Sequence, residues 1–320
     1  NRKIMKANVN VDIVILTYNE INLLKDCLKS VFQQTVLPKN IIIVDDGSND
    51  GTSNYILENY PSIKLINIRN NQGIPKGFNK ALKICDSDYV AWINNDTILK
   101  SNWLEEMYSF INKHPSAASC DSLIMYNDKR DIVWAMGGEY TIMGSCRFRN
   151  QRKNINDFKN LENKEIQVTV GCAAIYRRSV FDDIGVLDES FFLGFEDVDW
   201  SLRAILAGYK NYNVVSAVVY HKVSQTVKIG SEQYVRCGQR NVTATFIKNM
   251  PGALMFLTIP LHLFYQISSF MYYLSKKRGY AWLNAKLDNV KLFNYYMENR
   301  NRIQKNRKIN FIRFFNFLIF

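Results

Sequence analysis

Three acidic residues stand close together in an apolar and aromatic stretch, FFLGFEDVDWSLR, which covers residues 191–203. They are Glu196, Asp197 and Asp199. Burying a carboxylate among such neighbours costs free energy unless a cation or hydrogen bonds compensate for it. A carboxylate held in a partly dry pocket is also what a general base requires. Something must therefore compensate for the burial of these acids. One alternative is structural: Glu196 and Asp199 hydrogen-bond to the backbone or pair with Arg203, which we expect for Asp199.

Two further acids, Asp45 and Asp46, follow a β-branched run in the stretch VDDGSNDGT. In isolation they would indicate a helix cap and a turn. They gain weight beside the stretch ILTYNE, a second apolar run that ends in hydrogen-bonding side chains. An aspartate carboxylate can accept a hydrogen bond from a pyrimidine N–H, and Tyr18 can stack on the base. The two stretches together are consistent with a nucleoside site.

One more acid, Asp96, ends the stretch NND after the apolar run YVAWI. A single carboxylate is a weak metal ligand, and a turn is the structural alternative. A hard divalent cation with oxygen ligands would nevertheless suit a diphosphate group. His221 ends another apolar run; a single histidine is more often a packing residue, but neutral imidazole is a good ligand for manganese.

The stretch RNNQGIPKGFN carries Gly73, Lys76 and Gly77. The glycines allow close approach of the backbone to a ligand, and the lysine can meet a phosphate as a point charge. The stretch has neither the G-K-[ST] ending of a phosphate-binding loop nor the strict G-x-G-x-x-G pattern, so by itself it is weak evidence.

Alternating elements must position these residues. Strand-like runs cover residues 11–18, 40–51, 62–68 and 88–96. Segments with helical spacing cover residues 21–35, 53–60 and 78–85. This alternation predicts a parallel, doubly wound sheet, in which ligands bind at the carboxyl ends of the strands. The polar residues described above lie at such ends. The chain changes character from about residue 128 to 165, and the stretch RFRNQRKNINDFKNLENKE at 147–165 is polar and charge-mixed, which predicts an exposed loop.

Composition limits the class of protein. The chain has 320 residues, a formal net charge of +12, 47% hydrophobic and 22% charged residues. It can therefore form a substantial core, and the positive charge suggests an anionic partner. The six cysteines form no C-x-x-C pair, so we expect reduced thiols rather than a zinc site or disulfides. The first apolar run contains Asp12 and predicts a strand, not a signal peptide.

From about residue 251 the chain changes character. Residues 253–274 are apolar for about the length that crosses a bilayer. They contain Pro260, His262 and Gln266, so a helix that lies in the membrane interface is an equal alternative. Basic residues interleaved with aromatics follow, a composition typical of binding to an anionic membrane surface. A helical hairpin packed on the domain, or an oligomer interface, is the alternative.

In this order, the stretches VDIVILTYNE, IIIVDDGSNDGT, NQGIPKGFN, WINND, GCAAIYRRSVFDDIGVLDESFF and FEDVDWSLRAILAGY resemble family 2 glycosyltransferases of the GT-A fold. The resemblance is to the rhamnosyltransferase-like branch. It implies an α/β fold with a mostly parallel, nucleotide-binding sheet flanked by helices. It also implies a GT-A domain at 1–250, with a donor half at about 9–120 and an acceptor half at about 121–250. Residues 251–320 would then form a basic, aromatic-rich helical extension near the membrane.

The resemblance further implies transfer of a sugar by single displacement, with inversion of the anomeric centre. Asp197 falls on the position of the base. Glu196 is expected to hold an acceptor hydroxyl, and Trp200 to stack on a sugar unless it is a buried structural residue. Asp96 falls on the last position of the D-x-D element and His221 on a metal-binding histidine, which implies Mn²⁺ or Mg²⁺ as cofactor.

The donor contacts implied by the resemblance come from the strand ends and one loop. Asp46 would read the pyrimidine N–H, with Tyr18 and Asp45 near the nucleoside. Lys76 and Asn95 complete the expected donor site. Arg240 is a further candidate for a phosphate contact.

The implied donor is a pyrimidine nucleoside diphosphate sugar, first dTDP-rhamnose and then a UDP-sugar. The implied acceptor is lipid-linked or polysaccharide, in cell-surface glycan synthesis at the cytoplasmic face of the cell membrane. A homo-oligomer is possible. A sugar nucleotidyltransferase is rejected because LTYNEIN lacks the Gly-rich basic loop of that class. The remaining alternative is a non-enzymatic basic membrane or polyanion binder. Strand-end acids would repel phosphates without a metal, so no nucleic-acid partner is expected.

Overall fold

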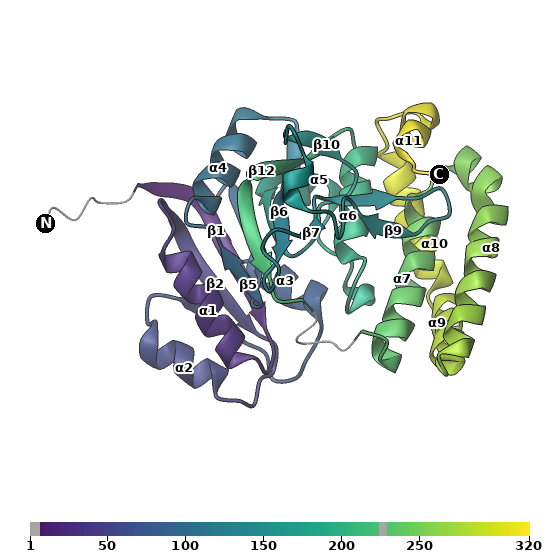
Figure 1. The fold of residues 1–320 in the computed structure, drawn as a ribbon. Helices are drawn as coiled ribbons and strands as arrows, with labels where there is room; N and C mark the ends of the chain where they lie inside the picture. Colours follow the sequence, from purple (N-terminus) through teal and green to yellow (C-terminus); the bar gives the residue numbers. More distant parts are fainter. Residues whose placement is uncertain (1–6, 224–228) are drawn as a thin grey trace, which may run out of the picture.

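The computed structural model describes residues 7–223 and 229–320. A central sheet lies between helices, and the C-terminal helices gather on one side of it (Figure 1). The first elements are β1 (Asn8–Thr17), α1 (Ile21–Phe32), β2 (Leu37–Asp45), α2 (Thr52–Asn59), β3 (Lys64–Asn67), α3 (Ile74–Leu82), β4 (Tyr89–Asn94), β5 (Thr97–Leu99) and α4 (Trp103–Lys113).

The next elements are β6 (Ala117–Tyr126), β7 (Val133–Ala135), β8 (Gly138–Tyr140), β9 (Cys146–Phe148), β10 (Lys164–Ile166), β11 (Ala173–Arg177), α5 (Arg178–Ile184), α6 (Glu196–Leu206) and β12 (Lys210–His221). Two short 3-10 helices are η1 (Ile155–Asp157) and η2 (Glu189–Phe191). The chain continues with α7 (Glu232–Asn249), α8 (Gly252–Ser275), α9 (Gly279–Lys291), α10 (Phe293–Lys305) and α11 (Phe311–Phe317).

Most strands of the described residues belong to one sheet, in the order β10-β12-β6-β11-β4-β1-β2-β3, with β5 beside β12 and β7 beside β6. Strand β1 is parallel to β2 and β4, and β2 is parallel to β3. Strand β11 is antiparallel to β4 and β6, so its first residues lie beside the last residues of β4. The mostly parallel sheet flanked by helices that the sequence predicts is confirmed.

Strand β1 shows why these apolar runs form buried strands. Its side chains alternate between the two faces of the sheet, and both faces are covered. Ile13 packs in one core with Leu28 of α1, and Val14 packs in the other with Phe78 of α3. A continuous apolar run is therefore required. The six cysteines are free thiols, as expected.

Residues 149–163 are exposed or partly exposed and contain no strand, which confirms most of the exposed loop predicted at 147–165. The strands before that loop, β7, β8 and β9, were not predicted; β7 pairs with β6, and β8 pairs with β9. Val133 and Ala135 are fully buried. Strands of three residues are too short to produce a readable alternation, and the charged residues around them dominated the sequence pattern.

A buried ionic cluster joins helix α7 to the segment that carries the three acids. Lys248 of α7 lies with its Nζ 2.5 Å from Asp188 Oδ2 and 2.9 Å from Asp199 Oδ1. Arg203 Nε lies 3.0 Å from the second oxygen of Asp199. All four side chains are almost completely buried. Asp199 is therefore a structural residue paired with Arg203, as expected from the sequence.

Replacing Lys248 by methionine should destabilise the protein strongly, because it leaves Asp188 and Asp199 buried with less compensating charge. Removal of one member of a buried ion pair costs about 3 to 5 kcal/mol. Chemical denaturation followed by circular dichroism measures this loss. Lys39→Met is the control, since Lys39 pairs with Asp86 at the surface; it should leave the midpoint unchanged. Equal midpoints for the two variants would contradict this view of the cluster.

Candidate active site

A cavity of about 880 Å³ opens at the carboxyl ends of β1, β2 and β4. Five of the residues singled out from the sequence line it: Tyr18, Asp46, Asn95, Asp96 and His221. They come from separate segments of the chain, which the sheet brings to one edge. This is the place where a parallel sheet with this topology binds ligands.

Asp96 and His221 are in direct contact although 125 residues separate them. Asp96 lies in the turn between β4 and β5, and His221 is the last residue of β12. Strand β5 pairs with β12 and places Thr97 opposite His221. As a result, His221 Nε2 lies 3.1 Å from Asp96 Oδ2. Both side chains are buried.

The two residues have unused ligand atoms. Asp96 Oδ1 and His221 Nδ1 are buried and have no hydrogen-bond partner among the described residues. An orphaned carboxylate oxygen beside an imidazole fits a divalent cation of the manganese or magnesium type. Within 7–223 and 229–320, no group of three His, Cys, Asp or Glu side chains could hold a metal. The remaining ligands of a cation at Asp96 would have to come from substrate oxygens.

Trp134 lies against His221, with ring centroids 4.5 Å apart and an interplanar angle of 81°. Trp134 also packs on Phe148, and both rings line the cavity. Sequence reasoning missed these two aromatics because they belong to strands of three residues, β7 and β9, which are too short to show a period. An edge-to-face contact of this kind fixes the orientation of the imidazole ring.

The two acids that follow β2 have different environments. Asp46 lines the cavity, and its carboxylate accepts hydrogen bonds from the amides of Gln72 and Gly73, both at 2.9 Å. Burial raises the pKa of Asp46, and these amides oppose the rise. Asp45 instead accepts from Ser48 N and Ser53 Oγ and lies outside the cavity wall. In this geometry Asp45 holds the turn that follows β2, as in the structural alternative.

Of the other expected donor contacts, Asn95 lines the cavity, whereas Lys76 and Arg240 do not. Asn95 donates from Nδ2 to Thr17 Oγ1 at 3.0 Å, which ties the β4–β5 turn to the end of β1. Lys76, in the first turn of α3, lies outside the cavity wall. Arg240 donates to Phe191 O at 2.7 Å and to Asn241 Oδ1 at 3.0 Å, so its guanidinium holds protein groups.

Asp197 is held by backbone amides at the start of α6. Its Oδ2 accepts from Gly171 N at 2.9 Å and its Oδ1 from Val198 N at 2.8 Å. The side chain is partly exposed. The helix begins directly after Phe195, which has φ of 70°, a left-handed conformation uncommon for a residue with a side chain. The sharp entry presents the first turn of α6 to the segment around Gly171.

Two hydrogen bonds from backbone amides connect Asp197 to the segment that carries the candidate cation ligand Asp96. Gly171 precedes Cys172, whose carbonyl oxygen accepts from Asn94 N at 2.8 Å. Asn94 lines the cavity and lies two residues before Asp96. A Cβ on Gly171 would lie 3.0 Å from Trp92 and 3.4 Å from the Cβ of Asp197, so the segment packs tightly at this point. Asp197 and Asp96 therefore lie near the same edge of the sheet, although Asp197 and Glu196 lie outside the cavity wall.

Glu196, beside Asp197, is buried, and its Oε2 has no hydrogen-bond partner among the described residues. Burial and the charge of Asp197 raise the pKa of Glu196 to about 8. Burial also raises the pKa of Asp197, and the amides of Gly171 and Val198 oppose this rise. Because the pKa of Glu196 lies near 8, its carboxyl group is mostly protonated at neutral pH.

The expectation that Trp200 stacks on a sugar was wrong. Trp200 is completely buried and donates from Nε1 to Gly185 O at 3.2 Å. Its ring packs against Phe181 and Tyr176, with centroids 4.6 and 5.2 Å away. No face of the ring remains for a ligand. The periodicity of α6 directs this position into the core between the helix and the sheet.

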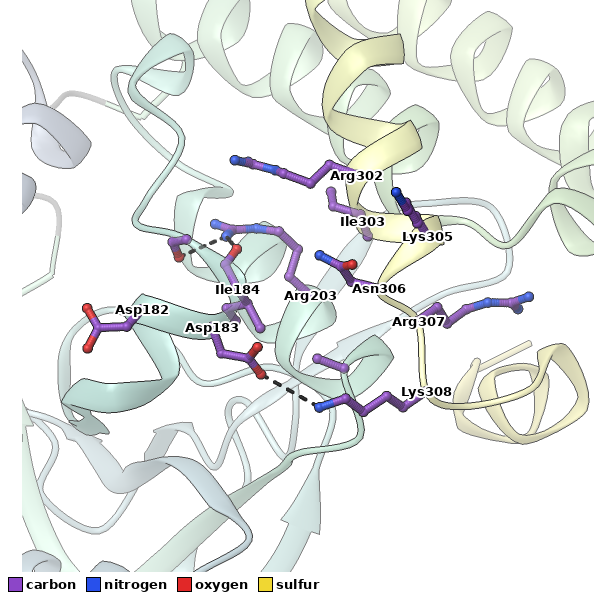
Figure 2. A pocket seen from close by; sticks show the side chains of 12 residues that line it. Asp182, Asp183, Ile184, Arg203, Arg302, Ile303, Lys305, Asn306, Arg307 and Lys308 are labelled. Carbon is purple, nitrogen blue, oxygen red and sulfur yellow. Dashed lines mark hydrogen bonds and ion pairs between the residues drawn. The ribbon is translucent and has the colours of Figure 1, made fainter.

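A second cavity, of about 490 Å³, lies between α5, α6 and α10 and contains none of the expected site residues (Figure 2). Arg203 extends into this region and donates to the carbonyl oxygens of Ile184, Gly185 and Val186. Basic residues at the end of α10 surround it, among them Arg302 and Lys305. Cations at helix C-termini offset the helix dipole, which accounts for this cluster without a ligand.

Comparison with known proteins agrees with this arrangement. Residues 12–185 match the family model described as glycosyl transferase family 2, which covers more than half of the chain. The chain has the GT-A fold and belongs to glycosyl transferase family 2. The family recognised from the sequence motifs is thus confirmed, and the chain is a glycosyltransferase of the rhamnosyltransferase-like type. The non-enzymatic alternative is excluded.

The curated relatives include two Salmonella enzymes. The O-antigen chain rhamnosyltransferase RfbN of Salmonella typhimurium is 26% identical over 92% of this chain and 98% of its own length. The O-antigen chain rhamnosyltransferase WbaN of Salmonella anatum is 29% identical over 85% and 89% of the two chains.

The solved structures include the crystal structure of S. aureus TarS 1–349, with a TM-score of 0.59 at 18% identity, over 93% of this chain and 89% of that one. The crystal structure of GalNAc-T7 with UDP, GalNAc and Mn²⁺ has a TM-score of 0.59 at 18% identity. That match covers 73% of this chain and 47% of GalNAc-T7. At this identity the two structures show the fold alone.

Replacing Glu196 by glutamine should change how stability depends on pH. The pKa of Glu196 is raised in the folded state, so its protonated form is favoured there. The resulting stability is fully present below the ordinary pKa of 4.5 and is lost as pH rises through about 8. The unfolding temperature of Glu196→Gln, measured relative to that of the wild type, should rise between pH 5 and pH 8.5. Glu58→Gln, on the exposed face of α2, should show no such gain. Parallel pH curves for wild type and Glu196→Gln would refute the assignment.

Proposed function

We propose that the chain transfers a sugar from a pyrimidine nucleoside diphosphate donor, dTDP-rhamnose or a UDP-sugar, to a lipid-linked or polysaccharide acceptor with inversion. The observation that carries the proposal is the position of Asp197 at the same sheet edge as Asp96 and His221. One edge then offers both a proton acceptor and a place for the charge of a leaving diphosphate. The rhamnosyltransferase names of the two Salmonella relatives support the donor class.

In the proposed reaction, the acceptor hydroxyl oxygen forms a bond to the anomeric carbon while the bond from that carbon to the diphosphate oxygen breaks. The electron pair of the broken bond leaves with the nucleoside diphosphate, and the hydroxyl proton passes to Asp197. Glu196 carries a proton at neutral pH and can donate a hydrogen bond to the acceptor. The amides of Gly171 and Val198 keep the carboxylate of Asp197 in one orientation. Attack from the face opposite the diphosphate inverts the anomeric centre.

Asp96 and His221 are the residues that would hold a divalent cation, Mn²⁺ or Mg²⁺. When bound, the cation would supply positive charge to the leaving diphosphate. Tyr18 and Asp46 line the part of the cavity at the ends of β1 and β2, where the nucleoside would bind. The related GalNAc-T7 structure contains UDP, GalNAc and Mn²⁺, which supports a metal in this reaction class.

Asp197→Asn should retain donor binding and lose transfer, because the amide keeps the shape but cannot accept the proton. We expect kcat to fall about 10²- to 10⁴-fold, the usual contribution of a general base. Nucleoside diphosphate with Mn²⁺ should raise the unfolding temperature of wild type and variant equally. Asp182→Asn, at an exposed position of α5, is the control and should transfer normally. Transfer at the normal rate by Asp197→Asn would refute the assignment of the base.

Helix α8 supports the proposal that the protein acts at a membrane surface. Its polar side chains face the protein and its apolar side chains face outward, the reverse of a helix in water. Its buried stripe is Leu254, Thr258, His262 and Gln266, which is mostly polar. His262 Nδ1 lies 2.7 Å from Met143 O, and Gln266 Nε2 lies 3.3 Å from Thr243 Oγ1. The polar residues that weakened a membrane-spanning interpretation of the sequence therefore face the protein.

The outward face of α8 is apolar. Phe256 is 79% exposed, and Leu257, Phe264 and Ile267 are 62 to 66% exposed. In water this arrangement is unfavourable, whereas the hydrocarbon of a bilayer reverses the preference. Helix α9 adds exposed side chains at helical spacing: Tyr280, Leu283, Leu287 and Val290. Figure 1 shows α8 at the outer edge of the molecule, with α9 next to it.

We infer that α8 and α9 lie in the membrane surface with their apolar faces embedded, and that α8 does not span the bilayer. Helix α8 is long and apolar enough to cross a membrane. Its polar stripe, however, packs on α7 and on Met143. Lys276, Lys277 and Arg278 at the turn between the helices would meet anionic headgroups. This position would place the enzyme peripherally on the cytoplasmic face of the membrane, where a lipid-linked acceptor is found.

Phe256→Ser combined with Phe264→Ser should abolish binding to phosphatidylglycerol vesicles in a sedimentation assay. Each phenylalanine contributes about 1.5 to 3 kcal/mol when fully buried, so we expect a loss of at least about a hundredfold. Leu57→Ser is the control because Leu57 is 61% exposed on α2, away from this surface. Unchanged vesicle binding would contradict the proposal. Self-association of the wild type without lipid, lost in the double variant, would instead assign the face to an oligomer.

A further inference from the structure

Three consecutive backbone amides are each held by a different side chain. Thr169 N donates to Ser201 Oγ at 3.1 Å, and Val170 N donates to Asp121 Oδ2 at 3.1 Å. Gly171 N donates to Asp197 Oδ2 at 2.9 Å. Ser201 and Asp197 belong to α6, whereas Asp121 belongs to β6 on the sheet. The segment 169–171 therefore links the first turn of α6 to the middle of the sheet.

Asp121 is an unexpected residue for its position. It lies within β6 between β11 and β12, where its ladder neighbours are Ala174 and Asn213. It is completely buried, and no ion pair of Asp121 occurs among the described residues. Its other oxygen accepts from Ser122 N at 2.9 Å. A strand interior of this kind ordinarily takes an apolar side chain, because an unpaired buried carboxyl group is costly.

Burial raises the pKa of Asp121 well above its ordinary value, and the nearby charge of Asp197 contributes to the rise. Whatever its protonation state, the side chain retains an oxygen that accepts from Val170 N. A hydrophobic residue of the same size would leave that buried amide without a partner. Asp121 thus accepts from the amides of Val170 and Ser122, and the amide of Gly137 also acts on its carboxyl group. The contact with Val170 is the one that reaches the segment of Gly171.

We propose that Asp121 is a positioning residue for the catalytic base. It fixes the peptide unit before Gly171, so that the next amide points at Asp197 and holds its carboxylate toward the acceptor. This inference rests on the proposed role of Asp197.

Asp121 lies apart from the residues that are expected to bind the donor. The expected donor contacts at Tyr18, Asp46 and Asp96 lie at the ends of β1, β2 and β4. Among the described residues, none of these three forms a hydrogen bond with the segment 169–171. Loss of Asp121 should therefore lower kcat and leave the KM for the donor unchanged. A general collapse of the fold would change both parameters.

Asp121→Leu removes the acceptor for Val170 N and keeps the branched shape and the number of heavy atoms of the side chain. We expect kcat to fall about ten- to a hundredfold, as for misplacement of a reacting group, with the donor KM within about twofold of the wild type. Asp121→Asn keeps an oxygen that can accept from Val170 N and should restore most of kcat. That rescue by the amide distinguishes a hydrogen-bond anchor from a requirement for charge.

Asp12→Leu is the matched control. Asp12 is also fully buried and accepts from two successive amides, Asp86 N and Ser87 N, but it lies near the start of β1 at the opposite edge of the sheet. It should lose comparable thermal stability with kcat unchanged. Equal kcat in Asp121→Leu and Asp12→Leu, or a rise in donor KM that accounts for the loss in Asp121→Leu, would overturn the proposal.

Two further variants keep the test decisive. If Asp121→Leu fails to fold, Ser201→Ala removes the neighbouring anchor at Thr169 and should lower kcat about threefold to tenfold; an unchanged kcat would overturn the proposal. Asp197→Asn in the same assay separates the two hypotheses. If it transfers normally, the role of Asp197 itself is wrong. If it is inactive while Asp121→Leu is normal, only the role of Asp121 is wrong.

Discussion

The hydrogen bond from the Gly171 amide to the Asp197 carboxylate is the contact on which the arrangement of the site depends. A carboxylate at the head of a buried helix needs compensation, and here backbone amides supply it. Within the part of the chain that the structure describes, no cation forms an ion pair with Asp197. An arginine or lysine at that place would lower the pKa of Asp197 and weaken it as a proton acceptor. The cations of this region, Arg203 and Lys248, instead neutralise Asp199 on the inner face of the same helix.

The same sheet edge is completed by a contact between distant parts of the chain. Strand β5 is only three residues long, yet its pairing with β12 brings His221 to Asp96. The antiparallel strand β11 begins beside the end of β4 and so brings Gly171 next to the polar turn after β4. Topology thus places the candidate base and the candidate cation ligands together, and no single motif could do this.

Much of this could be predicted from the sequence, for identifiable reasons. Strands buried on both faces leave long apolar runs, so β1, β2 and β4 and the polar residues after them were visible. The ordered motifs identified the family. Strands β7 to β9 were too short to show a period, and Trp134 was missed with them. Apolar character alone could not tell that Trp200 faces the core. The polar residues of α8 could not reveal their inward orientation before α7 was in place.

The central claim is that one bound donor meets Asp96 at its diphosphate and Asp197 at its sugar. A crystal structure with Mn²⁺ and a non-transferable pyrimidine nucleoside diphosphate sugar tests it most directly. We predict anomalous scattering from manganese beside Asp96 Oδ1, with the anomeric carbon facing Asp197 on the side opposite the diphosphate. A sugar whose anomeric carbon points away from Asp197, with another carboxylate in reach, would contradict the account.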